Sequence, residues 1–272
     1  MSWLDSPASA TQVTHARRLW LYVIAACVLA FLVVPTLIVV PMSFSGGQYL
    51  EFPPRQWSLR WYDNYFASSA WRQATATSFK AAALTSVLAT TLGTLAAYGL
   101  AASRFRIARA VHALLITPMI VPVILIAVAV FYVYVKAKLN NTLLGLVLAH
   151  SMLAVPLVMI IVTSALKHFD ANQEMVARSL GASRPRAFLL VTLPQIRFAV
   201  ISGALLSFLT SFDEVILALF VSGGANSTLT RNMFLALRDQ IDPTIAAIST
   251  IMILVTTVLF ALSQLFGTSR DD

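Results

Sequence analysis

The chain has 272 residues, of which 58% are hydrophobic and only 11% are charged, and its formal net charge is +8. Soluble domains carry about 25% charged residues, so this composition excludes an ordinary water-soluble protein and indicates a lipid environment. The positive charge does not indicate nucleic-acid binding, because the basic residues are scattered between apolar runs and form no stripe or block. The single cysteine, Cys27, excludes an intramolecular disulfide, and no Cys/His spacing typical of a metal site is present.

Six apolar stretches are long enough to cross a membrane as helices, which takes about 20 residues. They are residues 19–42, 74–102, 111–135, 143–166, 198–221 and 244–266. We therefore predict an all-α integral membrane fold with about six transmembrane helices, in one domain of residues 19–272 that follows a tail of residues 1–18. The first stretch exceeds the roughly 7–15 apolar residues of a signal peptide and is interpreted as a retained anchor.

The distribution of lysine and arginine predicts that both termini are cytoplasmic, because cytoplasmic loops are enriched in these residues. With the N-terminus inside, the cytoplasmic segments hold eleven of them and the external segments seven. The cytoplasmic set is Arg17, Arg18, Arg104, Arg106, Arg109, Lys167, Arg178, Arg184, Arg186, Arg197 and Arg270. The external set is Arg55, Arg60, Arg72, Lys136, Lys138, Arg231 and Arg238.

Prolines occur inside three of the predicted spans. Pro35 and Pro41 lie in the first, Pro118 and Pro122 in the third, and Pro156 in the fourth. Each proline frees a backbone carbonyl that neighbouring groups or water must satisfy. Two interpretations are open, namely ordinary kinking of membrane helices and a curved cavity around a translocation path.

The expected cytoplasmic loop of residues 167–197 contains two short helical patterns. Good helix formers over residues 171–180 follow Asp170 as the N-cap, with Glu174 in the first turns and Gly181 as the C-terminal stop. Residues 184–191 form the second pattern, which is expected to end near Pro194. A compact element tied to two spans in this way is typical of a docking site.

The second half of this loop resembles the cytoplasmic signature of the permease family of ABC importers. That signature reads Glu-Ala-Ala, three residues, Gly, nine residues, Ile, one residue and Leu-Pro. Gly181 is followed by nine residues and then by Val191, Thr192, Leu193 and Pro194, so valine replaces the isoleucine.

The first half of the loop departs from the signature. Met175, Val176 and Ala177 stand where the family has Glu-Ala-Ala, and Glu174 comes one position early. The departure leaves the docking role standing but puts any specific contact made by the family's glutamate in doubt.

The resemblance extends over essentially the whole chain, including the Thr-Pro-Met-Ile-Val-Pro stretch of residues 117–122. It implies a fold like that of type I ABC importer permeases and, as partners, a homologous permease subunit, two ATPase subunits and a solute-binding protein. The residues expected to dock on the ATPase are Glu174, Ala177, Arg178, Gly181, Ala182, Leu193 and Pro194. The sequence has no GxxxxGK[ST] phosphate-binding loop, so we expect ATP and magnesium on the partner ATPase and no cofactor on this chain.

An acidic pair, Asp213 and Glu214, lies roughly two thirds of the way across the fifth predicted span. A charge near the bilayer centre costs about 2.5 kcal/mol or more, and no basic residue of the chain lies at a comparable depth. Three interpretations are open: a polar gate or subunit contact, a passage for a cationic substrate, or a position near the outer interface. Neighbouring helical residues point about 100° apart, so at most one carboxylate is expected to face a path fully.

The segment that holds this pair resembles the polyamine (putrescine/spermidine) branch of the permease family, as do residues 215–222 and 241–250. The resemblance implies ATP-driven import of polyamines across the bacterial inner membrane. It also implies a translocation path formed by Ser211, Phe212, Asp213 and Glu214. Permeases for other small organic solutes, such as amino-acid derivatives or opines, look similar, and that alternative stays open.

Two other classes of protein, a membrane-embedded enzyme and a stand-alone secondary carrier, fit the sequence less well than a transport subunit. A membrane-embedded enzyme would need a catalytic constellation within the spans, but the histidines (His15, His112, His150 and His168) are interpreted as lying near or outside span ends, and they form no HExxH pattern. A stand-alone secondary carrier is typically built from repeated, broken helices around its ion site, and the sequence shows no such repeat. The docking loop also argues against a carrier.

Overall fold

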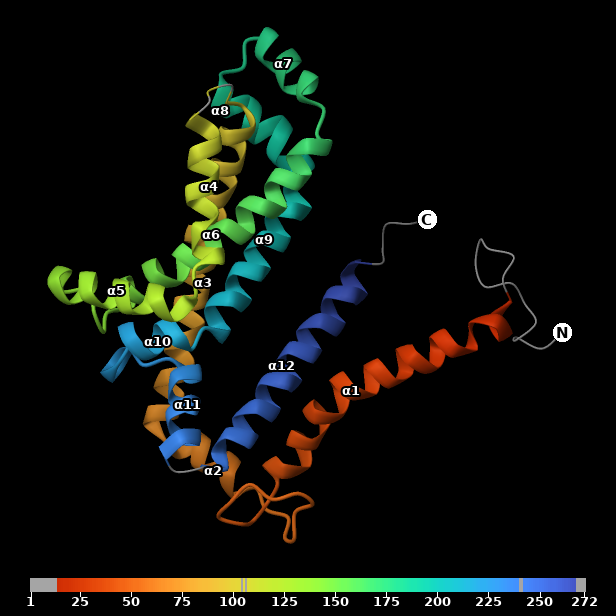
Figure 1. Cartoon of the computed structure of the whole chain (residues 1–272), viewed down its shortest axis with the longest axis vertical. Coiled ribbons are helices and arrows are strands. Elements are labelled where there is room, and N and C mark those ends of the chain that lie inside the picture. Colours follow the sequence, from red (N-terminus) through yellow and green to blue (C-terminus); the bar gives the residue numbers. More distant parts are fainter. Residues whose placement is uncertain (1–13, 104, 106, 240–241, 268–272) are drawn as a thin grey trace. The chain divides into compact units, whose positions relative to one another are not determined.

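The computed structural model describes residues 14–103, 105, 107–239 and 242–267, with side chains as far as residue 258. Over these residues the chain is helical, apart from loops and one β-bridge between Ser45 and Trp57. The α-helices are α1 (Leu19–Ser43), α2 (Arg60–Ala67), α3 (Ser69–Ala101), α4 (Ile107–Ile120), α5 (Val123–Ala137), α6 (Leu143–His168), α7 (Ala171–Ser179), α8 (Arg184–Ala187), α9 (Leu193–Asp213), α10 (Ile216–Val221), α11 (Leu229–Asp239) and α12 (Thr244–Gly267), shown in Figure 1.

The predicted all-α membrane fold is confirmed, and each of the six apolar stretches forms helix. Four helices among the described residues are long and apolar enough to cross a membrane, and a fifth span results if α4 and α5 are taken together. The described apolar part of α12, residues 244–258, is shorter. Arg104, Arg106, Arg270 and residues 1–13, on which part of the predicted orientation and tail depends, lie outside the described residues.

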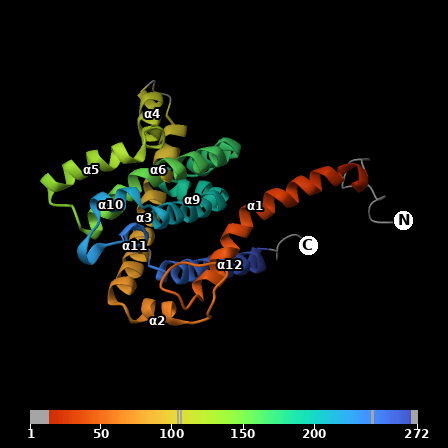
Figure 2. The ribbon, with the colours of Figure 1, turned by 60° about the horizontal axis from the view of Figure 1, so that its bottom comes forward.

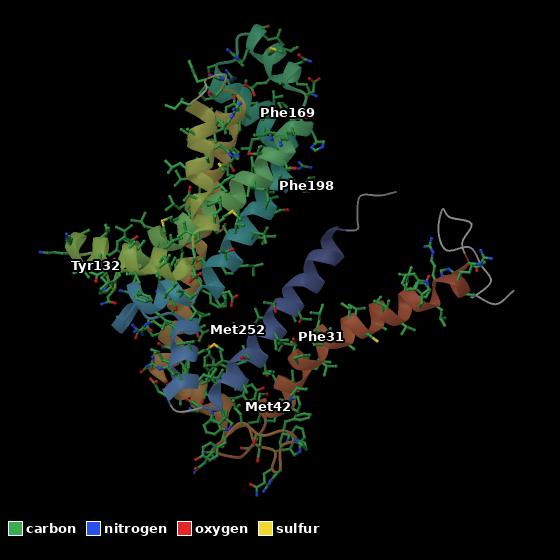
Figure 3. All side chains as sticks on the ribbon, viewed as in Figure 1. Phe31, Met42, Tyr132, Phe169, Phe198 and Met252 are labelled. Carbon is green, nitrogen blue, oxygen red and sulfur yellow. The ribbon has the colours of Figure 1, made fainter. Side chains whose placement is uncertain are left out.

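The chain divides into two compact units. Unit 1 comprises Met1–Ser68 and Ala236–Asp272, and unit 2 comprises Ser69–Leu235. In unit 1, α12 contacts α1 and α2, and the Asn64 side-chain amide donates a hydrogen bond of 2.8 Å to Thr244 Oγ1. The apolar side chains of α1, among them Phe31 (Figure 3), are exposed. Such a helix suits lipid or a partner subunit. The single domain of residues 19–272 stays a prediction.

Unit 2 is built on α3, α6 and α9, which pack against one another (Figure 2). Small residues permit a close approach of these helices: Gly93 of α3 and Gly203 of α9 both face Val158 of α6. A Cβ atom at position 93 would lie only 2.7 Å from the Val158 Cβ atom. Small residues at contacts are how membrane helices bring their backbones together.

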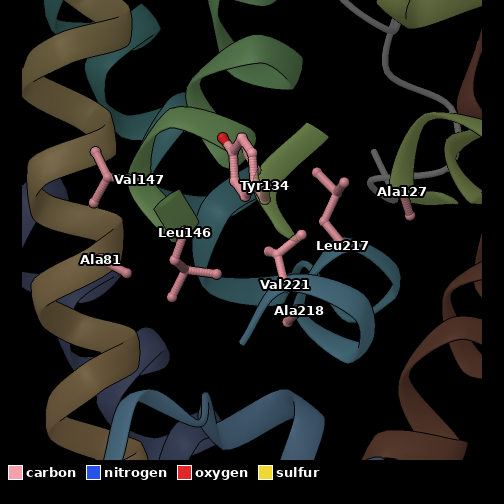
Figure 4. Packing of buried hydrophobic residues seen from close by; sticks show 9 residues of the cluster. Ala81, Ala127, Tyr134, Leu146, Val147, Leu217, Ala218 and Val221 are labelled. Atoms are coloured by element: carbon pink, nitrogen blue, oxygen red, sulfur yellow. The ribbon is translucent and has the colours of Figure 1, made fainter. Parts of the chain in front are cut away.

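A hydrophobic cluster joins α10 to α5, α6 and α3 within unit 2 (Figure 4). Tyr134, Leu146, Leu217 and Val221 are buried in it. The backbone also contributes, because the Asn141 N–H donates to the Val221 carbonyl oxygen at 2.9 Å. The short helix α10 is therefore held firmly at its place in unit 2.

The third apolar stretch, predicted as one helix over residues 111–135, is instead broken into the two helices α4 and α5. The helix direction bends by 104° between α4 and α5. Pro122, with φ −53° and ψ 126°, precedes the first residue of α5. A proline has no N–H to continue a helix, and it disfavours the α conformation of the residue before it. The prolines of the first and fourth stretches differ in effect, because Pro35, Pro41 and Pro156 lie inside unbroken helices.

The fifth apolar stretch also departs from the prediction of one helix over residues 198–221. Helix α9 ends at Asp213, and α10 begins at Ile216 after a turn. In the other direction, the helix continues back without a break to Arg184. The predicted stop near Pro194 is wrong, for a reason given below.

Candidate functional site

The loop between α6 and α9 is organised by the short helix α7, whose two ends are capped as predicted. The Asp170 side chain accepts a hydrogen bond of 3.0 Å from the Asn172 N–H. At the other end Gly181 has φ +93°, and the Ala182 N–H donates to the Ala177 carbonyl oxygen at 3.1 Å. This is the Schellman termination, in which a left-handed glycine lets the chain turn back on the last carbonyls.

Helix α7 has an inner and an outer face. Glu174 and Ala177, three residues apart, are half-buried, whereas every other residue of the helix is exposed. On the outer face Val176 is 58% exposed, and Leu180, just after the helix, is 84% exposed. Met175 is 54% exposed and also borders the pocket between α7 and the helices behind it. Exposed apolar side chains on a polar loop are a feature of surfaces that bind other proteins. We call Met175, Val176 and Leu180 the apolar tip.

The Glu174 carboxylate is engaged inside the chain. The Tyr98 hydroxyl at the end of α3 donates to its Oε1 atom at 2.6 Å, and the Thr192 hydroxyl donates to its Oε2 atom at 2.7 Å. The Tyr98 ring also packs on Phe188, with ring centroids 4.6 Å apart. The predicted docking residue Glu174 therefore contacts α3 and the segment before α9. Of the two further predicted docking residues on α7, Ala177 is half-buried and Arg178 is exposed.

A pocket of about 240 Å³ opens between α7 and the ends of α3 and α6. Phe169, labelled in Figure 3, and Leu166 form apolar parts of its wall, and Tyr98 and Glu174 form polar parts. The Glu174 carboxylate and the Tyr98 and Thr192 hydroxyls that bind it therefore lie at the wall of this pocket.

Leu193 and Pro194, which were predicted to belong to the docking loop, begin α9. Residues Phe188–Thr192 form one π-helical turn, with the Leu193 N–H bonded to the Phe188 carbonyl oxygen. The wider turn relieves the clash that a proline ring makes with the carbonyl four residues earlier in an α-helix. The helix therefore passes through Pro194 instead of ending there. Leu193 and Pro194 belong to α9 and not to the tip of the loop.

The acidic pair lies at the break between α9 and α10. Asp213 is the last residue of α9, and Glu214 leaves the helix with φ −71° and ψ 115°. The Glu214 Oε1 atom accepts a hydrogen bond of 2.8 Å from the Leu217 N–H, so this carboxylate caps α10. The Asp213 side chain is exposed, and among the described residues no hydrogen bond or ion pair engages it.

The other two predicted path residues have different surroundings. Ser211 is buried, and its Oγ atom lies 2.8 Å from Nδ1 of His150. The Phe212 ring contacts Phe79 and Phe208, with centroids 5.0 and 5.9 Å away. The interpretation that the histidines lie near or outside span ends is wrong for His150, which is buried inside α6. A polar residue amid an apolar stretch is the signal that could have found it.

These features define a class, a multi-pass helical membrane protein with a capped short helix in the loop between α6 and α9 and an interrupted spanning helix. Residues 89–270 match the family model described as the binding-protein-dependent transport system inner membrane component, and the chain belongs to this family. It is thus the permease of an ABC importer, a non-catalytic subunit of the inner membrane, and not an enzyme or a stand-alone carrier.

Curated relatives share most of their length with this chain. It is 34% identical to the spermidine/putrescine transport system permease protein PotC of Haemophilus influenzae, over 88% of this chain and 92% of PotC. It is 30% identical to the putrescine transport system permease protein PotI of Escherichia coli, over 87% and 86%. The molybdenum transport system permease protein ModB of Mycobacterium bovis is 27% identical, over 89% and 92%.

A solved structure shares the fold. It is the crystal structure of a bacterial ABC transporter involved in the import of the acidic polysaccharide alginate, with a TM-score of 0.71 and coverage of 95% of this chain and 99% of that one. The sequence identity is 14%, so the likeness concerns the fold alone. The family implies an ATPase and a binding protein as partners.

Proposed function

We propose that this permease imports polyamines such as putrescine and spermidine, and that Asp213 is the carboxylate that meets the cation on its way. The observation that carries the proposal is that the two carboxylates of the acidic turn, Asp213 and Glu214, have different contacts. Glu214 is occupied in capping α10, whereas Asp213 is exposed and, among the described residues, unpaired. A carboxylate at a broken membrane helix is a favourable site for a positively charged solute.

The aromatic rings beside this turn support the same substrate class. Phe208 and Phe212 stack with an interplanar angle of 12°, and Phe79 of α3 adjoins Phe212. Aromatic faces attract ammonium groups. A diamine passing the end of α9 would therefore meet both a negative charge and aromatic faces. The names of the relatives PotC and PotI agree with this substrate class.

The proposal includes the assembly around the chain. The apolar tip of α7 docks on a cytoplasmic ATPase subunit, which binds ATP and magnesium, and this chain binds no cofactor. A homologous permease completes the channel, two ATPase subunits drive it, and a solute-binding protein delivers substrate on the other face. The excess of basic residues in the loop around α7 supports cytoplasmic termini.

Uptake of radiolabelled putrescine and spermidine by cells with and without this chain tests the proposed substrate. We expect energy-dependent uptake that disappears when the chain is deleted and returns with the wild-type gene. Unchanged uptake on deletion, while the chain still copurifies with an ATPase, would refute polyamines as the substrate and redirect the search to other small solutes.

A further inference from the structure

Glu174 differs in orientation from the residues that form the apolar tip. Successive residues of a helix are about 100° apart around its axis. A glutamate one position early therefore faces a different side from one that would replace Met175. The structure bears out the geometry, because Met175 is exposed whereas Glu174 is half-buried and accepts two hydrogen bonds from its own chain.

The two donors to Glu174 come from different helical elements. Tyr98 stands in the last turn of α3, and Thr192 is the last residue of the π-helical turn that leads into α9. Thr192 is fully buried. Each carboxylate oxygen therefore binds one spanning element, and α7 is joined through a single side chain to both α3 and α9.

We propose that Glu174 is a positioning residue that transmits movement of α7 to α3 and α9 through Tyr98 and Thr192, and that it makes no docking contact with the ATPase. The inference rests on the proposed docking of α7. Hydrogen bonds to a charged acceptor are short and strong, and the bonds found here measure 2.6 and 2.7 Å. The Gln195 amide, which donates to the Gln173 side chain, adds a neighbouring link between α7 and α9.

We call the two hydrogen bonds of Glu174 to Tyr98 and Thr192 the tether. Its surroundings indicate why transmission of movement from α7 would depend on it. A pocket of about 240 Å³ lies between α7 and the ends of α3 and α6, and the hydrogen bonds of Glu174 to Tyr98 and Thr192 lie at its wall. The π-helical turn at Thr192 is a helix irregularity of a kind often found at functional sites. The tether therefore connects the docking helix to the part of α9 whose backbone departs from the α-helix.

The test uses variants that remove one hydrogen-bonding atom each and keep the shape of the side chain. These are Tyr98→Phe, Thr192→Val and Glu174→Gln, with Thr192→Ser as the conservative replacement and Tyr132→Phe, an exposed tyrosine of α5, as the matched control. The purified transporter, with its partner permease, ATPases and binding protein, is reconstituted in liposomes. Putrescine uptake and ATP hydrolysis are then measured together.

We expect Tyr98→Phe and Thr192→Val to lower the uptake per ATP hydrolysed by about fivefold, a factor appropriate to one lost hydrogen bond. Thr192→Ser and Tyr132→Phe should match the wild type. The combination of Tyr98→Phe with Glu174→Gln should lose little more than either change alone, because contacts in one network are not additive. Normal uptake per ATP in Tyr98→Phe and Thr192→Val overturns the inference, as does loss of ATPase copurification in Glu174→Gln.

A second measurement is independent of the substrate. Hydrogen–deuterium exchange of residues 171–179 should be about fivefold faster in Tyr98→Phe than in the wild type, because the tether opposes local opening of α7. Equal exchange rates overturn the tether. Absence of putrescine uptake by the wild-type transporter counts against the proposed substrate alone, and the exchange experiment still decides the tether.

Discussion

Nδ1 of His150 lies 2.8 Å from Oγ of Ser211, and this contact joins the first half of α6 to the last turn of α9. Both side chains are buried, and Nε2 of His150 has no hydrogen-bonding partner among the described residues. The contact fixes the helix end that carries the acidic turn. Ser211, predicted to line the path, has its hydroxyl engaged with α6 instead.

Replacement of His150 by alanine should therefore lower the stability of the permease. The change leaves the buried Ser211 hydroxyl without its partner and opens a cavity, which together cost about 2–4 kcal/mol. We expect a lower midpoint of thermal unfolding in detergent. His168→Ala, at an exposed position, serves as the control, and equal midpoints for the two variants would contradict the structural role of His150.

The packing of α3 on α6 predicts opposite outcomes for two glycines of one helix. Gly93→Ala places a methyl group 2.7 Å from the Val158 Cβ atom, whereas Gly99→Ala meets no atom within 4 Å. Overpacking of this kind costs about 1–3 kcal/mol, so the unfolding midpoint should fall for Gly93→Ala only. A similar midpoint for both alanine variants would show that α3 and α6 are not in close contact there.

The two carboxylates of the acidic turn should respond differently to neutralisation. Asp213→Asn is expected to reduce the uptake of cationic solutes with little change in thermal stability, because its side chain is exposed. Glu214→Gln removes the negative charge at the start of α10, at a cost of about 0.3–1 kcal/mol, and should lower the unfolding midpoint. Uptake and unfolding are measured on both variants. Equal effects of the two changes on both measurements would indicate a purely structural pair.

Gly181 closes α7 with φ +93°, a conformation that a β-branched residue tolerates poorly. Gly181→Val should distort the apolar tip at a cost of about 1–3 kcal/mol and reduce copurification of the ATPase, while the yield in the membrane stays normal. Ser183→Ala, at an extended backbone position, is the control. Coupled transport at the wild-type level in Gly181→Val would refute docking through this loop.

The sequence was sufficient to predict the helical class, the six apolar stretches and the caps of α7, because these depend on local composition and on residues with strong positional preferences. Asp170 and Gly181 act where they were expected to act. Kinking at Pro118 and Pro122 was one of the open interpretations, but neither the size of the bend at Pro122, 104°, nor the unbroken passage through Pro194 was predicted. Both sites contain proline, and the outcome depends on whether the preceding backbone turns away or widens into a π-helical turn.

The surroundings of the site residues depend on contacts between distant parts of the chain. The partners of Glu174 are 76 and 18 residues away from it, and Ser211 is 61 residues away from His150. No local pattern encodes such pairs. The division between Glu214 as a cap and Asp213 as an exposed carboxylate also required the break at the end of α9, which hydropathy alone does not reveal.

Helix α1 has a consequence for the membrane around it. Its 25 residues correspond to about 37 Å of helix, whereas the hydrocarbon core of a bilayer is about 30 Å thick. Because most of its apolar side chains are exposed, the mismatch is met by tilting of α1, by kinking at its prolines or by thickening of the adjacent lipid. The length of the acyl chains in the host membrane thus becomes a physical variable of transport, adjustable in liposomes without any change to the protein.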